Sequence, residues 1–272
     1  MQSKHTYGLL ISVYYGDEAE HFQLAVESCI NTGFHFDEFV VVIDGKIKKE
    51  VRQYINELSQ RNNIRVFQIN KNVGLAIALN HGLSIMKSDY IFRMDSDDIS
   101  LKNRFFQQKQ FIETNDNIDL LGGQIEEFDS KTNDVVGYRR VPSEMKDIKR
   151  MIRFKNPFNH PSVCFRREAV IGLEGYRDYR FFEDWDLWDR MIYHGYNCAN
   201  LPDVILRFRT NKEQLLRRHG YQYLIFEFRF LKHRLIEKRM NINVFLLRFA
   251  ISLFMRLVPI RMYNFLFKKI FR

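Results

Sequence analysis

This sequence of 272 residues has few of the residues that cross-link or interrupt a chain, with only 3 cysteines and 5 prolines. Cys29, Cys164 and Cys198 are odd in number and lack the paired spacing of a disulfide framework or a zinc site. We therefore interpret them as reduced side chains that pack in a core, as expected in a reducing compartment. No Pro/Gly-rich linker and no internal repeat divides the chain.

Long apolar runs are also missing. In the most apolar segment, Asn241 to Arg272, the longest uncharged run is seven residues, whereas a membrane-spanning helix needs about 20 mostly apolar residues. The first residues, Met1 to His5, do not lead into an apolar stretch of signal-peptide length. We therefore expect a protein that stays in the cytoplasm and has no transmembrane helix.

Charge is unevenly distributed along the chain. Residues 205–272 contain 16 Lys and Arg against 3 Asp and Glu, a net of +13, so residues 1–204 carry −4 of the total +9. Phe and Leu alternate with these basic residues, which predicts a helical extension over 211–272 that lies on an anionic membrane surface, each basic residue contributing roughly 1 kcal/mol. The alternative is a helix packed on the body or on a second copy. Nucleic-acid binding is not expected, because the body is acidic and lacks a binding motif.

The residues that are present indicate a folded α/β domain. The 25 Phe and 13 Tyr argue against disorder. In the first helix, Leu24, Val26 and Ile30 are expected to be buried. Strands alternating with helices predict a mostly parallel sheet with right-handed crossovers. The strands are expected at 7–14, 39–43, 64–69 and 90–94, and the helices at 18–32, 48–60 and 74–86.

After Ser100 the pattern changes. We expect a helix near 101–114, strands at 118–125, 135–141 and 203–208, and a helix near 183–194. These elements complete the same domain, so we expect one α/β domain over residues 1–210.

The most informative stretch is Asp95-Ser96-Asp97-Asp98, which directly follows the strand expected at 90–94. A strand that ends in carboxylates delivers them to the carboxyl edge of the sheet, where open α/β folds bind ligands. Carboxylate oxygens are also the ligands that hard divalent cations prefer. The cluster therefore predicts a cation and a phosphorylated substrate.

Other polar residues are expected at the same sheet edge. Asp44 follows the second strand, where its carboxylate can accept hydrogen bonds from a uracil imide or a ribose hydroxyl; the alternative is an ordinary turn aspartate. Val13 to Tyr15 end the first strand. The run of small residues from Asn72 to Gly82 opens the third helix, whose N-terminus favours anions. Close helix packing is the alternative explanation for that run.

A second acidic pair, Glu183-Asp184, begins the helix expected near 183–194. Acidic residues suit the first turn of a helix because of the helix dipole. Aromatic neighbours on both sides, Phe182 and Trp185 among them, would desolvate a carboxylate and raise its proton affinity, which suits a general base.

Taken in order, these motifs resemble the family 2 inverting glycosyltransferases, which have the GT-A nucleotide-sugar-binding fold. The likeness covers about residues 7–210. A narrower likeness, carried by residues 92–100 with Arg104 and by 159–163, is to bacterial enzymes that build exopolysaccharide and O-antigen repeat units, including amylovoran-type and β-1,3-galactosyl transferases. The residues that carry the wider resemblance are Ile11 to Tyr15, Asp44, Asn72-x-Gly74-x-Ala76-x-Ala78-x-Asn80-x-Gly82, Asp95-x-Asp97-Asp98 and Glu183-Asp184.

The resemblance implies roles for individual residues. Asp184 would be the base, with Glu183 as its neighbour or substitute. Mn²⁺ or Mg²⁺ would be held by Asp95, Asp97 and Asp98. Arg93 would steady the diphosphate, although neutralisation of the adjacent carboxylates is the alternative. The residues implied to bind the UDP-sugar donor are Val13, Tyr15, Asp44, Asn72, Gly74, Arg93 and Asp95.

The resemblance also implies a reaction. It is transfer of galactose from UDP-galactose to N-acetylglucosamine on undecaprenyl diphosphate, with a β-1,3 linkage, at the cytoplasmic face of the bacterial inner membrane during O-antigen assembly. UDP-glucose and UDP-N-acetylhexosamines remain alternative donors. The Gln-x-x-Arg-Trp motif of processive synthases is absent, so a single sugar addition is favoured.

Three basic side chains, His160, Arg207 and Arg209, are further candidates for substrate contact, with ordinary loop or surface positions as the alternative. Leu79 stands where many relatives carry arginine.

Two other classes stay open. A nucleotidyltransferase also places aspartates on an α/β fold, but the residues after the first strand form no Gly-rich phosphate loop. A non-catalytic membrane scaffold would leave the acidic motifs without a role.

Overall fold

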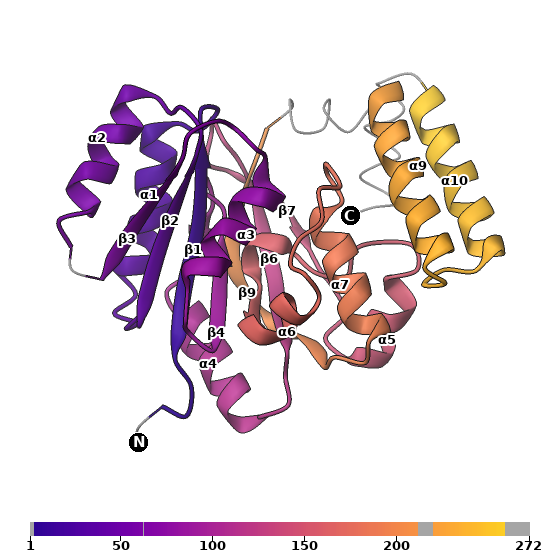
Figure 1. The fold of residues 1–272 in the computed structure, drawn as a ribbon, viewed down its shortest axis with the longest axis horizontal. Coiled ribbons are helices and arrows are strands. Elements are labelled where there is room, and N and C mark those ends of the chain that lie inside the picture. The colour runs from indigo at the N-terminus through magenta and orange to yellow at the C-terminus, as the bar shows by residue number, and fades with distance from the viewer. Residues whose placement is uncertain (1–2, 62, 212–219, 259–272) are drawn as a thin grey trace.

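The computed structural model describes residues 3–61, 63–211 and 220–258. One mixed sheet runs through the molecule, with helices on both faces and a helical hairpin at one side (Figure 1). Its strand order is β3-β2-β1-β4-β8-β6-β9-β5, and β7 pairs with β6.

The first half is the parallel α/β unit that the alternating pattern predicted. Neighbouring strands in the order β3-β2-β1-β4 are all parallel. Only a helix separates each strand from the next, so the carboxyl ends of β1, β2 and β4 reach one edge. The elements are β1 (Tyr7–Tyr14), α1 (Ala19–Ile30), β2 (Glu38–Asp44), α2 (Lys49–Leu58), β3 (Ile64–Ile69), α3 (Leu75–Ile85) and β4 (Tyr90–Met94).

The second half extends the same sheet. Strand β8 is antiparallel to both β4 and β6, and β6 is parallel to β9. The pairing of β4 with β8 therefore joins the two halves. The elements are β5 (Ile99–Ser100), α4 (Arg104–Thr114), β6 (Leu120–Asp129), β7 (Val135–Arg139), α5 (Met145–Met151), η1 (His160–Ser162), β8 (Cys164–Arg166), α6 (Arg167–Gly172), α7 (Glu183–Tyr193) and β9 (Cys198–Thr210).

Each face of the sheet carries its own core, because successive side chains of a strand point to opposite faces. On β1, Leu9 and Ile11 pack with α1, α2 and α4, while Leu10 packs with α3 and the helices of the second half. All three cysteines are free thiols that are buried. Both cores are apolar and aromatic, in agreement with the composition.

One burial prediction in α1 is wrong. Leu24 is 45% exposed, whereas Val26 is buried and Ile30 is partly buried against the core. The buried residues of α1 are Phe22, Ala25, Val26 and Cys29, which follow helical spacing. Leu24 lies two positions from Phe22 and therefore points away from the face that they share.

The C-terminal part contains two helices, α9 (Tyr221–Ile236) and α10 (Ile242–Leu257), which form a hairpin beside α5 and α7 (Figure 1). Phe230 and Leu231 of α9 are buried in the core cluster that includes Trp185 of α7. Residues 212–219 and 259–272 of the predicted extension lie outside the described residues. Across the described ranges, no helix has the length and apolar character needed to cross a membrane.

Candidate functional site

The strand register brings the predicted site residues to one edge of the sheet. Tyr14 of β1 is level with Asp44 of β2, and Ile11 of β1 is level with Met94, the last residue of β4. Asp44 and the carboxylates that follow Met94 therefore emerge at the same edge, as predicted.

Asp95, Asp97 and Asp98 form one cluster, in which each offers a carboxylate oxygen within 4.8 Å of the others. Asp98 is fully buried. Its Oδ1 accepts a hydrogen bond from the backbone N–H of Arg209 at 2.8 Å, and its Oδ2 is buried with no hydrogen-bond partner among the described residues. An unpartnered buried oxygen beside two further carboxylates fits a hard divalent cation.

The electrostatics of the cluster lead to the same conclusion. Burial, and then the negative charge of Asp95, raises the pKa of Asp97 to about 6. Burial and the charges of Asp97 and Asp95 raise the pKa of Asp98 well above its usual value. A bound cation would oppose this mutual repulsion.

Asp17 is a fourth carboxylate near the cluster that the sequence analysis missed. Burial raises its pKa to about 7, and the charges of Asp97 and Asp95 add to the shift. Its Oδ2 accepts a hydrogen bond from the backbone N–H of Tyr14 at 2.8 Å. Its place just after the first strand was a signal that could have revealed it.

Arg93 is buried within β4, and its Nη2 lies 2.5 Å from Asp95 Oδ1. This arrangement favours the alternative reading, in which Arg93 neutralises an adjacent carboxylate.

Arg209 of β9 also contacts the cluster, since its Nε donates a hydrogen bond to the backbone oxygen of Asp97 at 2.7 Å. Arg207 instead pairs with Glu126, with 2.8 Å between Nε and Oε1.

Asp44 binds the segment that opens α3. Its Oδ1 accepts from the backbone N–H of Val73 at 2.7 Å, and its Oδ2 accepts from Asn72 Nδ2 and the Gly74 backbone N–H, both at 2.9 Å. Gly74 has φ +91°, a left-handed conformation that suits glycine. The anion at this helix N-terminus is therefore Asp44 itself. A carboxylate has about four acceptor positions, so about one remains for a ligand.

The other two predicted donor-binding residues differ in exposure. Tyr15 is 66% exposed just after β1, whereas Val13 is fully buried in the core. The side chain of Tyr15 is therefore open to a ligand, while that of Val13 packs inside the sheet layer.

The acidic pair begins α7, as the aromatic-flanked motif predicted. Asp184 Oδ2 accepts a hydrogen bond from Asn156 Nδ2 at 2.7 Å. Glu183 Oε2 is buried without a hydrogen-bond partner among the described residues. Burial, followed by the charge of Asp184, raises the pKa of Glu183 to about 7, and Arg93 and Asp95 also act on it. Glu183 therefore lies close enough to Arg93 and Asp95 for their charges to act on its carboxyl.

Helix α3 positions the segment that leads into α7. Asn80 donates from Nδ2 to the carbonyl oxygen of Tyr176 at 2.7 Å and accepts from its N–H at 2.8 Å. Tyr176 Oη in turn lies 3.1 Å from His160 Nε2. Burial and the charge of Arg93 keep the pKa of His160 well below its usual value. His160 is therefore a neutral, partly buried contact of Tyr176.

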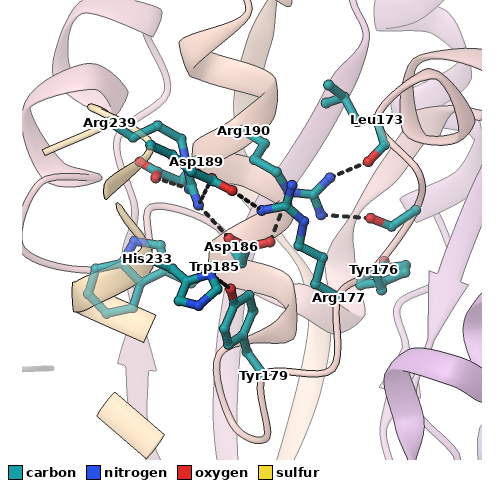
Figure 2. A network of polar contacts seen from close by, with 12 residues as sticks. Leu173, Tyr176, Arg177, Tyr179, Trp185, Asp186, Asp189, Arg190, His233 and Arg239 are labelled. Carbon is teal, nitrogen blue, oxygen red and sulfur yellow. Dashed lines mark hydrogen bonds and ion pairs between the residues drawn. The ribbon is translucent and has the colours of Figure 1, made fainter. Parts of the chain in front are cut away.

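Farther along α7, buried ion pairs hold the helix against the C-terminal hairpin. Arg190 and Arg239 both pair with Asp186 at 2.8 Å (Figure 2). Asp189 pairs with Arg234 at 2.8 Å and with Arg239. Arg234 belongs to α9 and Arg239 follows it, so residues far along the chain hold the helix that carries Glu183 and Asp184.

These pairs correct one inference drawn from charge alone. In α10, Arg248 is buried and lies 2.7 Å from Glu227 Oε1 of α9. Arg234, Arg239 and Arg248 are therefore balanced inside the protein and do not face a membrane. Helix α9 and these three arginines therefore pack on the rest of the protein, which was the alternative to membrane binding.

The fold is that of the GT-A nucleotide-sugar transferases. One similar solved structure is TarS 1–349 of S. aureus in complex with UDP-GlcNAc, with a TM-score of 0.63 and 16% identity over 83% of this chain and 65% of that chain. Another is the mannosyltransferase PcManGT of Pyrobaculum calidifontis in complex with GDP-Man and Mn²⁺, with a TM-score of 0.63 and 14% identity over 84% of this chain and 64% of that chain. This chain thus spans slightly less than two thirds of those two chains.

The chain belongs to glycosyl transferase family 2, whose model matches residues 10–172. It is 32% identical to the amylovoran biosynthesis glycosyltransferase AmsE of Erwinia amylovora, over 97% of this chain and 98% of that protein. It is 30% identical to a UDP-Gal:α-D-GlcNAc-diphosphoundecaprenol β-1,3-galactosyltransferase of Escherichia coli, over 98% of this chain and 96% of that protein.

Proposed function

We propose that this protein transfers one galactose, with inversion, from UDP-galactose to N-acetylglucosamine linked to a lipid diphosphate, forming a β-1,3 linkage in surface-polysaccharide synthesis. The observation that carries the proposal is the cluster of Asp95, Asp97 and Asp98, together with a Glu183 close enough for the charge of Asp95 to act on its carboxyl. The likeness to the E. coli enzyme over nearly the whole chain supports the choice of donor and acceptor. UDP-glucose and UDP-N-acetylhexosamines are the alternative donors.

On the donor side, Asp95, Asp97 and Asp98 would hold Mn²⁺ or Mg²⁺. The bound cation would neutralise the charge that develops on the departing nucleoside diphosphate. The backbone N–H of Arg209 orients the Asp98 carboxylate. Tyr15, Asp44, Asn72 and Gly74 line the edge where the nucleotide would lie.

On the acceptor side, Asp184 would remove the proton of the attacking hydroxyl as it reaches the anomeric carbon. Asn156 donates to Asp184 Oδ2 and so orients the carboxylate. Attack on the face opposite the leaving group turns an α-linked donor into a β-linked product. Glu183 lies beside it, and burial and the charge of Asp184 raise the pKa of Glu183 to about 7.

Family membership favours this reaction over nucleotidyl transfer. A non-catalytic scaffold would have no use for the buried Asp98 oxygen or for a glutamate whose pKa is raised to about 7. Both features suit a site that binds a cation and moves a proton.

The decisive experiment compares UDP-sugars as donors to a synthetic N-acetylglucosaminyl diphosphate lipid. We expect the highest kcat/KM with UDP-galactose and, by NMR of the product, a β linkage to O3. A higher kcat/KM with UDP-glucose or a UDP-N-acetylhexosamine would replace the donor. An α product would refute inversion.

We also propose that the hairpin binds the cytoplasmic face of the membrane peripherally. Helix α10 carries a row of exposed apolar side chains, with Leu246 56%, Leu247 52% and Phe254 57% exposed. Such a row can enter the headgroup region of a bilayer. This location would place the site beside a lipid-linked acceptor.

Replacing both Leu246 and Leu247 by glutamate should lower binding to anionic phospholipid vesicles at least ~tenfold, since burying one leucine contributes about 1.5–3 kcal/mol. Vesicle sedimentation measures the effect. The matched control is Leu24→Glu in α1, which also removes an exposed leucine. Truncation at Asn241 is a poorer test, because it would remove Arg248 and leave Glu227 buried and unpaired. Equal sedimentation of the double variant and the control would refute the membrane-binding face.

A further inference from the structure

A cavity of about 560 Å³ lies between the segment before α7 and helix α9, outside the carboxylate cluster. Figure 2 shows two of its lining side chains, Tyr179 and His233, pointing toward each other, with 2.5 Å between Tyr179 Oη and His233 Nδ1. The lining residues are Asp178, Tyr179, Arg180, Phe226, Arg229, Lys232, His233 and Ile236.

The lining combines positive charge with apolar surface. Arg180, Arg229 and Lys232 stand against a single acidic residue, Asp178. Within the ranges that the structure describes, none of these three cations forms an ion pair. The Arg180 guanidinium lies over two aromatic rings, 5.4 Å from the centroid of Phe181 and 5.8 Å from that of Phe226. Such stacking leaves the N–H groups at its edge available to an anion.

The position of the cavity relates it to the acceptor. Arg180 is three residues before Glu183, so their Cα atoms can be at most about 11 Å apart. In a sugar diphosphate, one sugar ring separates the attacking hydroxyl from the phosphate on the anomeric carbon. A hydroxyl held at Asp184 would therefore place its diphosphate within reach of this cavity. Ile236, 63% exposed on the rim, offers apolar contact to the start of a lipid chain.

We propose that this cavity is the subsite for the diphosphate of the lipid-linked acceptor, with Arg180, Arg229 and Lys232 as its phosphate ligands. The inference rests on the proposed function, and it makes the acceptor's diphosphate, in addition to its sugar, a determinant of specificity. The donor's diphosphate lies elsewhere, at the Asp95-Asp97-Asp98 cluster. Lysine and arginine are the side chains that bind phosphate through charge-assisted hydrogen bonds.

The test compares two soluble acceptors in the absence of lipid: N-acetylglucosaminyl diphosphate on a short alkyl chain, and the alkyl N-acetylglucosaminide without phosphate. The ratio of their kcat/KM values measures selectivity for the diphosphate. In the double variant Arg229→Ala/Lys232→Ala we expect this ratio to fall at least ~tenfold, mostly through KM of the diphosphate acceptor, because the variant loses two charged hydrogen-bond donors to phosphate. Arg229→Lys, which keeps the charge, should retain most of the ratio.

The control is Lys49→Ala/Lys87→Ala, which removes two exposed lysines far from the cavity and should leave the ratio at the wild-type value. An unchanged ratio in Arg229→Ala/Lys232→Ala would overturn the subsite. If that variant loses binding to vesicles while the kcat/KM ratio stays unchanged, Arg229 and Lys232 bind membrane headgroups. That result would also overturn the diphosphate subsite.

A binding measurement separates failure of this inference from failure of the proposed function. Calorimetric titration with a short-chain alkyl diphosphate, without divalent metal, should give an affinity that the double variant lowers at least ~tenfold. Another outcome is that the protein binds the alkyl diphosphate more tightly than the double variant does and yet uses no N-acetylglucosamine acceptor. That result would refute the proposed reaction and leave the anion site in place. Equal affinities in wild type and variant would refute the site, whatever the acceptor.

Discussion

Replacing Asp97 by asparagine should abolish sugar transfer and leave the fold intact. Asparagine keeps the shape of the side chain but removes one of three negative charges that lie within 4.8 Å of one another. Cation binding should weaken, and stabilisation of the leaving diphosphate by a cation is worth several kcal/mol, so the rate should fall roughly 10³-fold or more. Steady-state rates with Mn²⁺ and Mn²⁺ binding by electron paramagnetic resonance would measure both effects.

Stability provides the internal check on this variant. Burial and the charge of Asp95 raise the pKa of Asp97 to about 6. The metal-free folded protein therefore favours the protonated, neutral form of Asp97 more than the unfolded chain does. A neutral asparagine should therefore preserve or increase thermal stability without metal. Asp134→Asn, at an exposed position, is the matched control and should keep full activity. Full transfer by Asp97→Asn would remove Asp97 from the metal site.

Replacing Asp184 by asparagine should lower kcat by about 10²–10⁴, the usual contribution of a general base, while the UDP-sugar still binds. The amide cannot accept the hydroxyl proton, but it has nearly the shape of the carboxylate. Donor affinity by calorimetry and single-turnover rates separate binding from chemistry. Wild-type transfer by Asp184→Asn would exclude Asp184 as the base.

The pH profile of Glu183→Gln distinguishes the two members of the pair. Burial and the adjacent charge of Asp184 raise the pKa of Glu183 to about 7. If Asp184 is the base, Glu183→Gln keeps the base and removes the neighbouring group that takes up a proton near pH 7. The acid limb of kcat/KM should then move to lower pH, with kcat reduced less than in Asp184→Asn. The opposite ranking of the two variants would make Glu183 the base.

The sequence predicted the parallel half of the fold closely because its signals are local. The strands at Ile64–Ile69 and Tyr90–Met94 have the predicted limits, since each is an apolar run bounded by polar or turn residues. The same patterns indicated that Asp44 and Asp95 follow strands. Parallel pairing then requires that such residues meet at one edge.

The partners of these residues were not predictable, because they come from distant parts of the chain. Asn156 orients Asp184 from outside any motif, and Arg209 contacts Asp97 and Asp98 from the end of β9. Arg239 looked like part of a membrane-binding tail but lies buried against Asp186. A count of charges cannot show which of them find a buried partner.

The sequence by itself determined the kinds of residue at the strand ends and at the start of α7, and through them the family. Only the tertiary structure decided that Asp98 keeps an unpartnered buried oxygen, that Glu183 is a member of the acidic pair whose pKa burial raises, and that the C-terminal hairpin holds α7. The physical reason is that patterning and propensity act over a few neighbouring residues. Desolvation and ion pairing depend instead on which distant side chains the folded chain brings within a few ångströms.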